Sequence, residues 1–426
     1  MTDIDVRIKA LGAKGDGVAE AYGGAIFVPF AAPGDLVKLR LSKSKDGSRR
    51  GKILLITEPG NDRHPAACMH FTECGGCSVQ HLSPTAYQAW KRDIVCQALE
   101  RQNLDVSVIA DLVAGSAGSR RRARFSARRL AGGTILGFLE MGSHRIVDLN
   151  ECPVLHSDII SVVPPLRELL DGLLDVRGTA EIAVTRADSG LDITLLMAEE
   201  TDLKVRENLA VFAETNDVAR ISWKPLKSKA GDSAEPIVAR RAVVMKFGDV
   251  QTEIPPDAFI QPTSWGEQTL REHVVAAVGG AAKVVELYAG CGAFTLPIAQ
   301  SGSQIFAVDM AQDHLEGLSR AARSNALGER VTVEARNLDR RPLAGPELDA
   351  VDVAVLDPPR AGASSQVGLL AQSAIPVVVY VSCNPQSFAR DARKFIDGGY
   401  RLESVVPIDQ FLWSPHIELV SVFRRP

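Results

Sequence analysis

ELYAGCGAFT, residues 286–295, is the stretch that decides the fold, because it follows an apolar run and opens a helical pattern. Glycines at such a point let the backbone come close to a ligand in the crevice at the carboxyl ends of parallel strands. Thr295 stands where a dinucleotide-binding loop would have its third glycine. This substitution disfavours a nicotinamide cofactor.

Two acidic residues accompany the loop. Glu286 precedes the glycines, and Asp309 ends the next apolar run. The arrangement suits S-adenosylmethionine, with the carboxylate of Asp309 accepting hydrogen bonds from the ribose hydroxyls. The alternative is that Asp309 is an incidental acid at a strand end.

The C-terminal part of the chain contains five mostly apolar runs separated by helical patterns. Runs of this composition are typical of strands buried on both faces, so we predict an open parallel sheet. The runs are KVVELYAG (283–290), QIFAVDM (304–310), RVTVEARN (330–337), DVAVLDPP (352–359) and VVVYVSC (377–383). YRLESVVPID (400–409) and HIELVSVFRR (416–425) are predicted to pair antiparallel at one edge. The predicted fold class is therefore α/β, with a Rossmann-like sheet over residues 251–426.

Two reactive side chains are expected at the carboxyl edge of this sheet. Asp357 precedes two prolines, which end the fourth strand and present the carboxylate there. An aromatic residue after those prolines would indicate an amino-group methyltransferase, and Arg360 disfavours that reaction. Cys383, in VSCNP, is either a packing residue or a working thiol, and its position at the strand end favours the thiol.

Four other cysteines form a second candidate site. Cys68, Cys74, Cys77 and Cys152 supply four thiolates, and Gly75-Gly76 let the backbone fold tightly around an ion or cluster. Tetrahedral zinc and an iron–sulfur cluster both use four thiolates, and the spacing does not decide between them. Cys96 and Cys291 are predicted to be packing residues.

The rest of the chain suggests two more domains. Residues 1–57 read as short strands with turn signals, which predicts a small OB-like β-barrel, either an RNA-binding module or a structural cap. Residues 58–250 are predicted to be a central α+β domain with hairpins near 118–150, a helix near 161–175 and strands near 180–197.

Charge and composition set limits on the function. The formal net charge of the 426-residue chain is −4, so contacts with nucleic acid must come from local basic patches. Two patches are present, at 37–52 and at 120–129. No apolar run approaches the roughly 18 residues that a membrane helix needs, and the acidic N-terminus does not resemble a signal peptide. A cytoplasmic protein without membrane contact is expected.

These motifs resemble the RNA 5-methyluridine methyltransferases, in the iron–sulfur-containing branch that modifies ribosomal RNA. The resemblance covers almost the whole chain and includes ELYAGCGAFTLPIA, VLDPPRAGA, VSCNP and PHIELV, in the family's order. The first 57 residues resemble the family's TRAM barrel. Phe259-Ile-Gln261-Pro-Thr263 and Ala293 depart from the family's usual residues, which leaves details of the cofactor pocket open.

The resemblance implies a role for each candidate residue. Cys383 would add to C6 of a uracil and activate C5 for methylation, and Glu418 would then remove the C5 proton. Gln261, Tyr288, Asp309 and Asp357 would line the S-adenosylmethionine pocket, with Asn337 near the adenine. Cys68, Cys74, Cys77 and Cys152 would hold a [4Fe-4S] cluster, which the resemblance favours over zinc.

The predicted activity is therefore S-adenosylmethionine-dependent methylation of a uridine at C5 in 23S ribosomal RNA, by a monomer. Transfer RNA is the alternative substrate. A non-catalytic RNA-binding protein on a methyltransferase scaffold is an alternative of another class, which Cys383 and Glu418 argue against.

Overall fold

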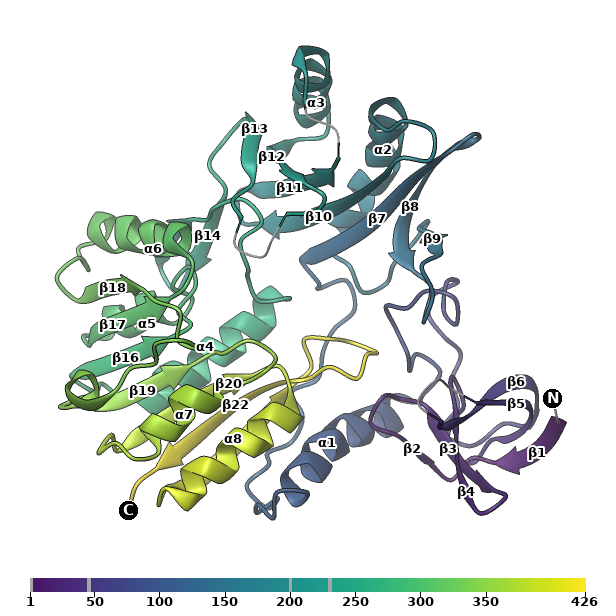
Figure 1. The fold of residues 1–426 in the computed structure, drawn as a ribbon, viewed down its shortest axis with the longest axis horizontal. Helices are drawn as coiled ribbons and strands as arrows, with labels where there is room; N and C mark the ends of the chain where they lie inside the picture. Colours follow the sequence, from purple (N-terminus) through teal and green to yellow (C-terminus); the bar gives the residue numbers. More distant parts are fainter. Residues whose placement is uncertain (1–2, 44–46, 199–200, 229–231) are drawn as a thin grey trace.

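The computed structural model describes residues 3–43, 47–198, 201–228 and 232–426. The chain forms three large sheets that follow one another in sequence (Figure 1). In Figure 1 the N-terminal sheet is purple, the central sheet teal, and the C-terminal sheet green to yellow.

The N-terminal sheet has six short strands in the order β1-β5-β6-β4-β3-β2. Its apolar side chains, among them Ile8, Ile26 and Leu39, form a core separate from the rest of the molecule. The prediction of short strands joined by turns is confirmed over the described residues. The strands are β1 (Asp3–Arg7), β2 (Ala10–Leu11), β3 (Gly17–Ala21), β4 (Gly24–Val28), β5 (Leu36–Lys43) and β6 (Arg49–Glu58).

The central sheet has seven strands in the order β13-β12-β11-β10-β7-β8-β9. Helices α2 (Ser157–Leu173) and α3 (Leu203–Thr215) contribute apolar residues to one core on this sheet. The predicted hairpins, helix and strands are present, with boundaries shifted by a few residues. The strands are β7 (Arg122–Leu130), β8 (Gly133–Leu139), β9 (Ile146–Asp148), β10 (Thr179–Ala187), β11 (Gly190–Met197), β12 (Val218–Pro225) and β13 (Glu235–Ala239).

The C-terminal sheet confirms the predicted open α/β architecture. Five parallel strands and two antiparallel ones lie in the order β18-β17-β16-β19-β20-β22-β21. The last two strands pair with each other, as predicted, and β22 also pairs with β20. The strands are β16 (Lys283–Leu287), β17 (Gln304–Asp309), β18 (Val331–Ala335), β19 (Val353–Leu356), β20 (Val377–Ser382), β21 (Arg401–Ile408) and β22 (Glu418–Arg424).

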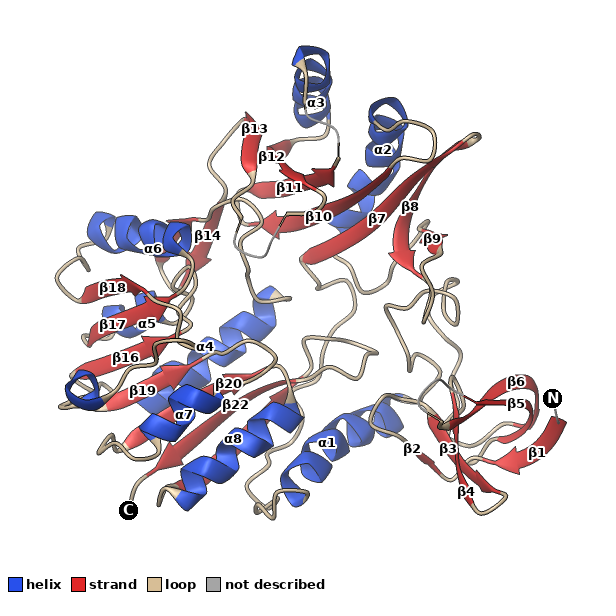
Figure 2. Cartoon of the chain, viewed as in Figure 1, coloured by secondary structure: helices blue, strands red, loops and turns tan. Residues whose placement is uncertain are grey.

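Helices cover both faces of this sheet (Figure 2). Apolar residues of α4 (Ser264–Val278), α5 (Thr295–Gln300) and α6 (Gln312–Ser324) share the core on one face. Those of α7 (Ser364–Leu370) and α8 (Pro385–Asp397) share the core on the other. Such a doubly covered sheet presents its ligands at the carboxyl ends of the strands.

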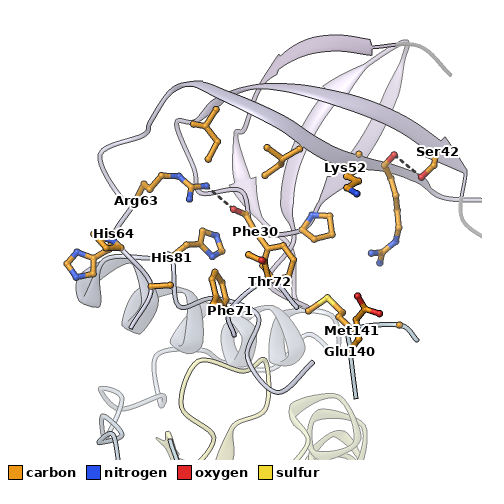
Figure 3. A pocket seen from close by; sticks show the side chains of 18 residues that line it. Phe30, Ser42, Lys52, Arg63, His64, Phe71, Thr72, His81, Glu140 and Met141 are labelled. Atoms are coloured by element: carbon orange, nitrogen blue, oxygen red, sulfur yellow. Dashed lines mark hydrogen bonds between the residues drawn. The ribbon is translucent and has the colours of Figure 1, made fainter. Parts of the chain in front are cut away.

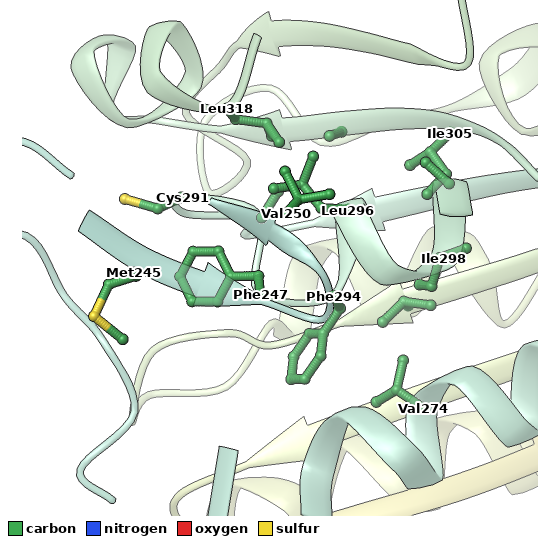
Figure 4. Close-up of a cluster of buried hydrophobic side chains, with 14 of the residues drawn as sticks. Met245, Phe247, Val250, Val274, Cys291, Phe294, Leu296, Ile298, Ile305 and Leu318 are labelled. Atoms are coloured by element: carbon green, nitrogen blue, oxygen red, sulfur yellow. The ribbon is translucent and has the colours of Figure 1, made fainter. Parts of the chain in front are cut away.

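Two segments that lie before or across the predicted domain boundary at residue 251 also pack on the C-terminal sheet. The apolar face of α1 (Pro84–Glu100), with Val95 and Leu99, lies in the same core as α8. The hairpin of β14 (Val244–Phe247) and β15 (Val250–Glu253) packs on the opposite face. Figure 4 shows Phe247 and Cys291 in that core, which confirms Cys291 as a packing residue. Cys96 is only half-buried against its core.

No helix in the described part of the chain is both long enough and apolar enough to cross a membrane.

Candidate active site

Strand register brings three predicted residues to one edge of the C-terminal sheet. Leu287, the last residue of β16, pairs with Val308 of β17 and with Leu356 of β19. The residues that follow these three positions are Tyr288, Asp309 and Asp357. They therefore emerge side by side at the carboxyl ends of the strands, where ligands of such sheets bind.

Cys383 and Glu418 reach the same edge from two antiparallel strands. Ser382 of β20 pairs with Leu419 of β22, so the next position along β20 faces Glu418. The Glu418 residue is 3% exposed, and burial together with Asp357 raises the pKa of its carboxyl well above the usual value. The pKa of the half-buried Cys383 thiol is raised to about 11 by burial and by Glu418 and Asp357, while Arg360 opposes the rise. These mutual effects place the thiol within electrostatic reach of both carboxyls.

Asp357 is held by a chain of side-chain amides. Gln261 donates from Nε2 to Oδ2 of Asp357 at 3.2 Å, and Gln410 donates from Nε2 to Oε1 of Gln261 at 3.0 Å. The Oε1 of Gln410 accepts from Thr263 Oγ1 at 3.2 Å. Burial raises the pKa of Asp357 to about 7, and Asp309 adds to the rise, whereas the bond from Gln261 lowers it.

The turn after Asp357 is tied to the turn after Cys383. The carbonyl oxygen of Arg360 accepts from Asn384 Nδ2 at 3.0 Å and from Ser387 Oγ at 3.1 Å. Asn384 also caps helix α8, accepting from the N–H of Gln386 at 3.1 Å. The two turns that carry the reactive side chains are therefore fixed to each other.

The glycine loop shows features of a ligand cradle. Gly290 has a φ of +54°, and a Cβ added there would meet no atom within 4 Å. Its N–H donates to Asp309 Oδ2 at 2.9 Å, while Asp309 Oδ1 accepts from the N–H of Ala311 at 2.8 Å. Tyr288 has a φ of +66°, a strained conformation for a bulky residue, and its buried hydroxyl has no hydrogen-bond partner among the described residues. An orphaned hydroxyl beside an open backbone fits a site for a polar cofactor.

A buried carboxyl lies beneath the loop. Glu286 is 2% exposed and accepts from Thr295 Oγ1 at 2.5 Å. Burial raises its pKa to about 8, with further contributions from Asp357 and Asp309. Thr295, which replaces the third glycine of the dinucleotide motif, is thus a partner for Glu286. Asn337 is engaged in its own turn, accepting from the N–H of Asp339 at 3.0 Å.

The four predicted ligand cysteines line one cavity of about 220 Å³. Burial raises the pKa of all four thiols, that of Cys77 to about 12, so thiolates there need a neighbouring positive charge. Arg120 also lines the cavity, as do Phe411 and His416 from the loop before Glu418. Among the residues that the structure describes, no three His, Cys, Asp or Glu side chains are gathered closely enough for a single metal ion.

The arginine patch at 120–129 is more interior than its sequence suggests. Arg121 is buried, with Nη2 2.6 Å from Oε2 of Glu267, and it joins the central sheet to α4. Arg124 pairs with Asp257 at 3.1 Å and Arg129 with Asp171 at 2.5 Å. Of the six arginines, Arg128 alone has a side chain with no ion pair or hydrogen bond to another described residue, although its backbone pairs with both neighbouring strands.

Sequence reasoning did not single out Gln410, Lys91 or Glu267. Gln410 lies in the loop between β21 and β22, and its partner Gln261 is 149 residues away in sequence. No local pattern marks such a residue, because its role depends only on the tertiary fold.

The comparisons with known proteins agree with this geometry. Residues 240–425 match the family described as tRNA (Uracil-5-)-methyltransferase. The chain is 40% identical, over 98% of its length and 97% of the relative's, to an uncharacterized RNA methyltransferase of Mesorhizobium japonicum. It is 38% identical, over 99% of its own length and 100% of the relative's, to one of Caulobacter vibrioides.

A solved structure shares the fold of the whole chain. It is the tRNA (uracil-54, C5)-methyltransferase of Pyrococcus abyssi in complex with S-adenosyl-L-homocysteine. The TM-score is 0.78 at 24% identity, covering 98% of this chain and 99% of that one. The chain therefore belongs to the RNA uracil-5-methyltransferase family and is an enzyme.

Proposed function

We propose that the protein methylates C5 of a uridine in 23S ribosomal RNA through a covalent bond between Cys383 Sγ and C6 of the uracil. The observation that carries this proposal is the convergence of Cys383, Glu418 and Asp357 at one strand edge. A packing cysteine would have no need of two carboxyls at the same strand edge, one of which can take the thiol proton.

The thiol is the nucleophile in the proposed reaction. In the free enzyme it is protonated at neutral pH, so its proton must leave as the Sγ–C6 bond forms. Asp357, whose pKa is about 7, is suited to accept that proton. Addition at C6 moves an electron pair onto the C5–C4–O4 system as an enolate, which makes C5 nucleophilic. When bound, S-adenosylmethionine supplies the methyl group at this carbon.

Glu418 acts after the transfer. Its carboxylate removes the proton that remains on C5, and the electrons of that C–H bond form the C5–C6 double bond and expel the thiolate. Apolar surroundings and Asp357 favour its protonated form. It is therefore a stronger base, once ionised, than an exposed glutamate.

The residues around the loop are proposed to bind the cofactor. Tyr288, Asp309 and Gln261 would hold S-adenosylmethionine with Asp357. The open space at Gly290 and the unpartnered hydroxyl of Tyr288 support this assignment.

The cysteine cavity is proposed to hold a [4Fe-4S] cluster on Cys68, Cys74, Cys77 and Cys152. All four thiols line one cavity, and four thiolates are the ligand set that such a cluster uses; the family resemblance favours it over zinc. Iron and sulfide analysis of anaerobically purified protein tests this. Cys77→Ser should lose the iron, whereas Cys96→Ser, outside the cavity, should keep it. Stoichiometric zinc in the wild type would overturn the assignment.

Ribosomal RNA is the proposed substrate, and the cytoplasm is the proposed location of the enzyme. The four-cysteine set and the N-terminal sheet, proposed to be a TRAM barrel over residues 1–57, support it through the family resemblance. Residues 58–250 would then form the domain that holds the cluster, with the exposed Arg128 as the arginine of the 120–129 patch that is free to contact RNA. Residues 251–426 would form the catalytic domain. Transfer RNA remains the second candidate, because the description of the matching family and the solved structure both name it.

One experiment tests the reaction and the substrate together. The protein is incubated with S-adenosylmethionine and with ribosomal or transfer RNA whose uridines are replaced by 5-fluorouridine, which has no C5 proton to lose. A covalent protein–RNA complex should form with the ribosomal RNA and be absent in Cys383→Ala. If a complex formed with transfer RNA alone, transfer RNA would be the substrate. If neither RNA formed a complex, the mechanism would be refuted.

A further inference from the structure

A second cavity, of about 1020 Å³, opens on the N-terminal side of the cysteines (Figure 3). One wall is the N-terminal sheet, with Lys52 and Ile53 of β6. The opposite wall is the cysteine-bearing segment, with Phe71 and His81, and the tip of the β8–β9 hairpin, with Met141, lies at its margin. We call this cavity the barrel-side groove. None of its lining residues belongs to the candidate active site.

Three rings in contact form the floor of the barrel-side groove. The ring of Phe71 stacks on that of His81, with centroids 5.7 Å apart and planes inclined by 28°. Phe30 meets Phe71 edge-on, at 5.1 Å and 76°. His81 is 2% exposed, neither of its ring nitrogens has a hydrogen-bond partner among the described residues, and burial lowers its pKa to about 4. His81 is therefore a neutral support for Phe71, which stays partly exposed.

The cysteine loop sets the position of Phe71. The N–H of Phe71 donates to the carbonyl of Cys68 at 3.2 Å, and that of Cys74 donates to the carbonyl of His70 at 2.9 Å. Thr72 follows with a φ of +79°, which is a strained conformation for a β-branched residue. Such strain persists only where the surrounding structure imposes it, and it is concentrated at functional sites. Phe71 also lines the cysteine cavity, so it separates the two cavities.

The lining of the barrel-side groove carries three cationic side chains and one acidic side chain, Glu140, which is itself ion-paired. Arg63 is used internally, since Nη2 lies 2.6 Å from Oδ2 of Asp35. Arg50 is also paired, with its Nη2 3.3 Å from Oδ2 of Asp16. Lys52 is exposed on the groove wall and has no ion pair within the part of the chain that the structure describes. A free ammonium group and a partly exposed ring in the lining of one groove offer the two contacts that a nucleotide needs, one for the phosphate and one for the base.

We propose that the barrel-side groove binds an unpaired nucleotide of the RNA substrate, with its base stacked on Phe71 and its phosphate contacting Lys52. This inference rests on the proposed function only in taking RNA as the substrate. It gives the cysteine loop a second task, because the loop that carries Cys68 and Cys74 also presents the stacking ring. RNA held there lies outside the site of methyl transfer, so the contact serves recognition rather than chemistry.

Equilibrium binding of fluorescent single-stranded oligoadenylate by the whole protein, without S-adenosylmethionine, tests the proposal. Phe71→Leu keeps the apolar bulk and removes the aromatic face, and it should weaken binding about tenfold. Phe71→Trp should bind at least as tightly as the wild type. Tyr22→Ala removes an aromatic side chain that is 65% exposed on the same sheet but outside the groove, and it should bind as the wild type does. A duplex of equal length should bind more weakly than the single strand.

Two results would overturn the proposal. One is binding of oligoadenylate by Phe71→Leu within twofold of wild type while its melting temperature is unchanged. The other is equal affinity for single strand and duplex, which would indicate contacts with phosphates alone. Oligoadenylate contains no uridine, so the outcome is independent of methylation. A protein that forms no adduct with 5-fluorouridine RNA could still bind oligoadenylate more weakly as Phe71→Leu. A protein that forms the adduct could likewise bind oligoadenylate equally well with and without the Phe71 ring.

Discussion

Lys91 Nζ lies 2.7 Å from Asp409 Oδ1, and both side chains are completely buried. Lys91 also donates to the carbonyl oxygens of Phe411 and His416, and Tyr87 donates from its hydroxyl to Asp409 Oδ2 at 2.6 Å. One lysine on α1 therefore fixes the loop that leads into Glu418. The pair links the placement of the proposed base to a helix that precedes the central sheet.

Replacing this lysine should destabilise the protein. Lys91→Met leaves Asp409 buried and uncompensated, which costs on the order of 3–5 kcal/mol in the free energy of unfolding. Denaturant unfolding measures this loss, and Lys91→Met with Asp409→Asn should recover part of it. Arg101→Met, at the exposed end of α1, should change little. Equal unfolding free energies for Lys91→Met and the wild type would contradict the importance of the pair.

Glu418→Gln should stop the reaction after methyl transfer. The amide has nearly the shape of the carboxyl but cannot take the C5 proton, so the covalent Cys383 complex should accumulate on unmodified uridine. Denaturing gels of labelled RNA measure this accumulation. Glu403→Gln, on an exposed ion pair of β21, is the matched control and should turn over normally. Sustained turnover by Glu418→Gln would exclude it as the base.

Glu286 should make stability depend on pH. Its pKa is about 8 in the folded protein and near the ordinary value of 4.5 when unfolded. The folded state therefore binds the proton more tightly, and the free energy of unfolding should fall as pH rises from about 4.5 to 8. Glu286→Gln removes this titration, so at pH 8 it should be more stable than wild type by about 4 kcal/mol. The free energy of unfolding is measured against pH for the wild type, for Glu286→Gln and for the exposed control Glu316→Gln. Identical slopes for all three proteins would refute the role of Glu286.

The parallel sheet and its reactive edge could be predicted from sequence because each signal is local. Strands buried on both faces read as unbroken apolar runs, and Asp357 and Cys383 directly follow such runs. Glu418 likewise lies at the end of a buried run, since it is the first residue of β22. The edge at which parallel strands end then follows from topology, so residues far apart in sequence could be expected to meet there.

The arginine patch shows where local reading fails. Along the central strand β7 side chains alternate, and Ala123 and Phe125 point into the core. Arg121 has the same parity, so it is buried against Glu267 instead of facing solvent. A run of arginines hides this alternation, because charge does not reveal which face a side chain takes until the strand is paired. Gln410 and Lys91 were missed because their partners are distant in sequence.

Gln261 should set the pH at which the enzyme becomes active. The hydrogen bond that its side-chain amide donates to Asp357 lowers the pKa of that carboxyl, which burial otherwise raises. Asp357 accepts a proton in the proposed reaction, so activity should fall as pH drops through its pKa of about 7. Gln261→Leu removes the donor and should move the acid limb of the kcat/KM profile upward by about one pH unit.

Thr263→Val is the control for this shift. It removes the hydrogen bonds of the Thr263 hydroxyl with Gln410 and with the N–H of Gly266 at the start of α4. It leaves the hydrogen bond from Gln261 to Asp357 in place, so its acid limb should stay at the wild-type pH. If Gln261→Leu lowers activity equally at every pH, the amide acts on cofactor binding alone. A shift that appears in Gln261→Leu and not in Thr263→Val would instead show that the amide controls the protonation of Asp357.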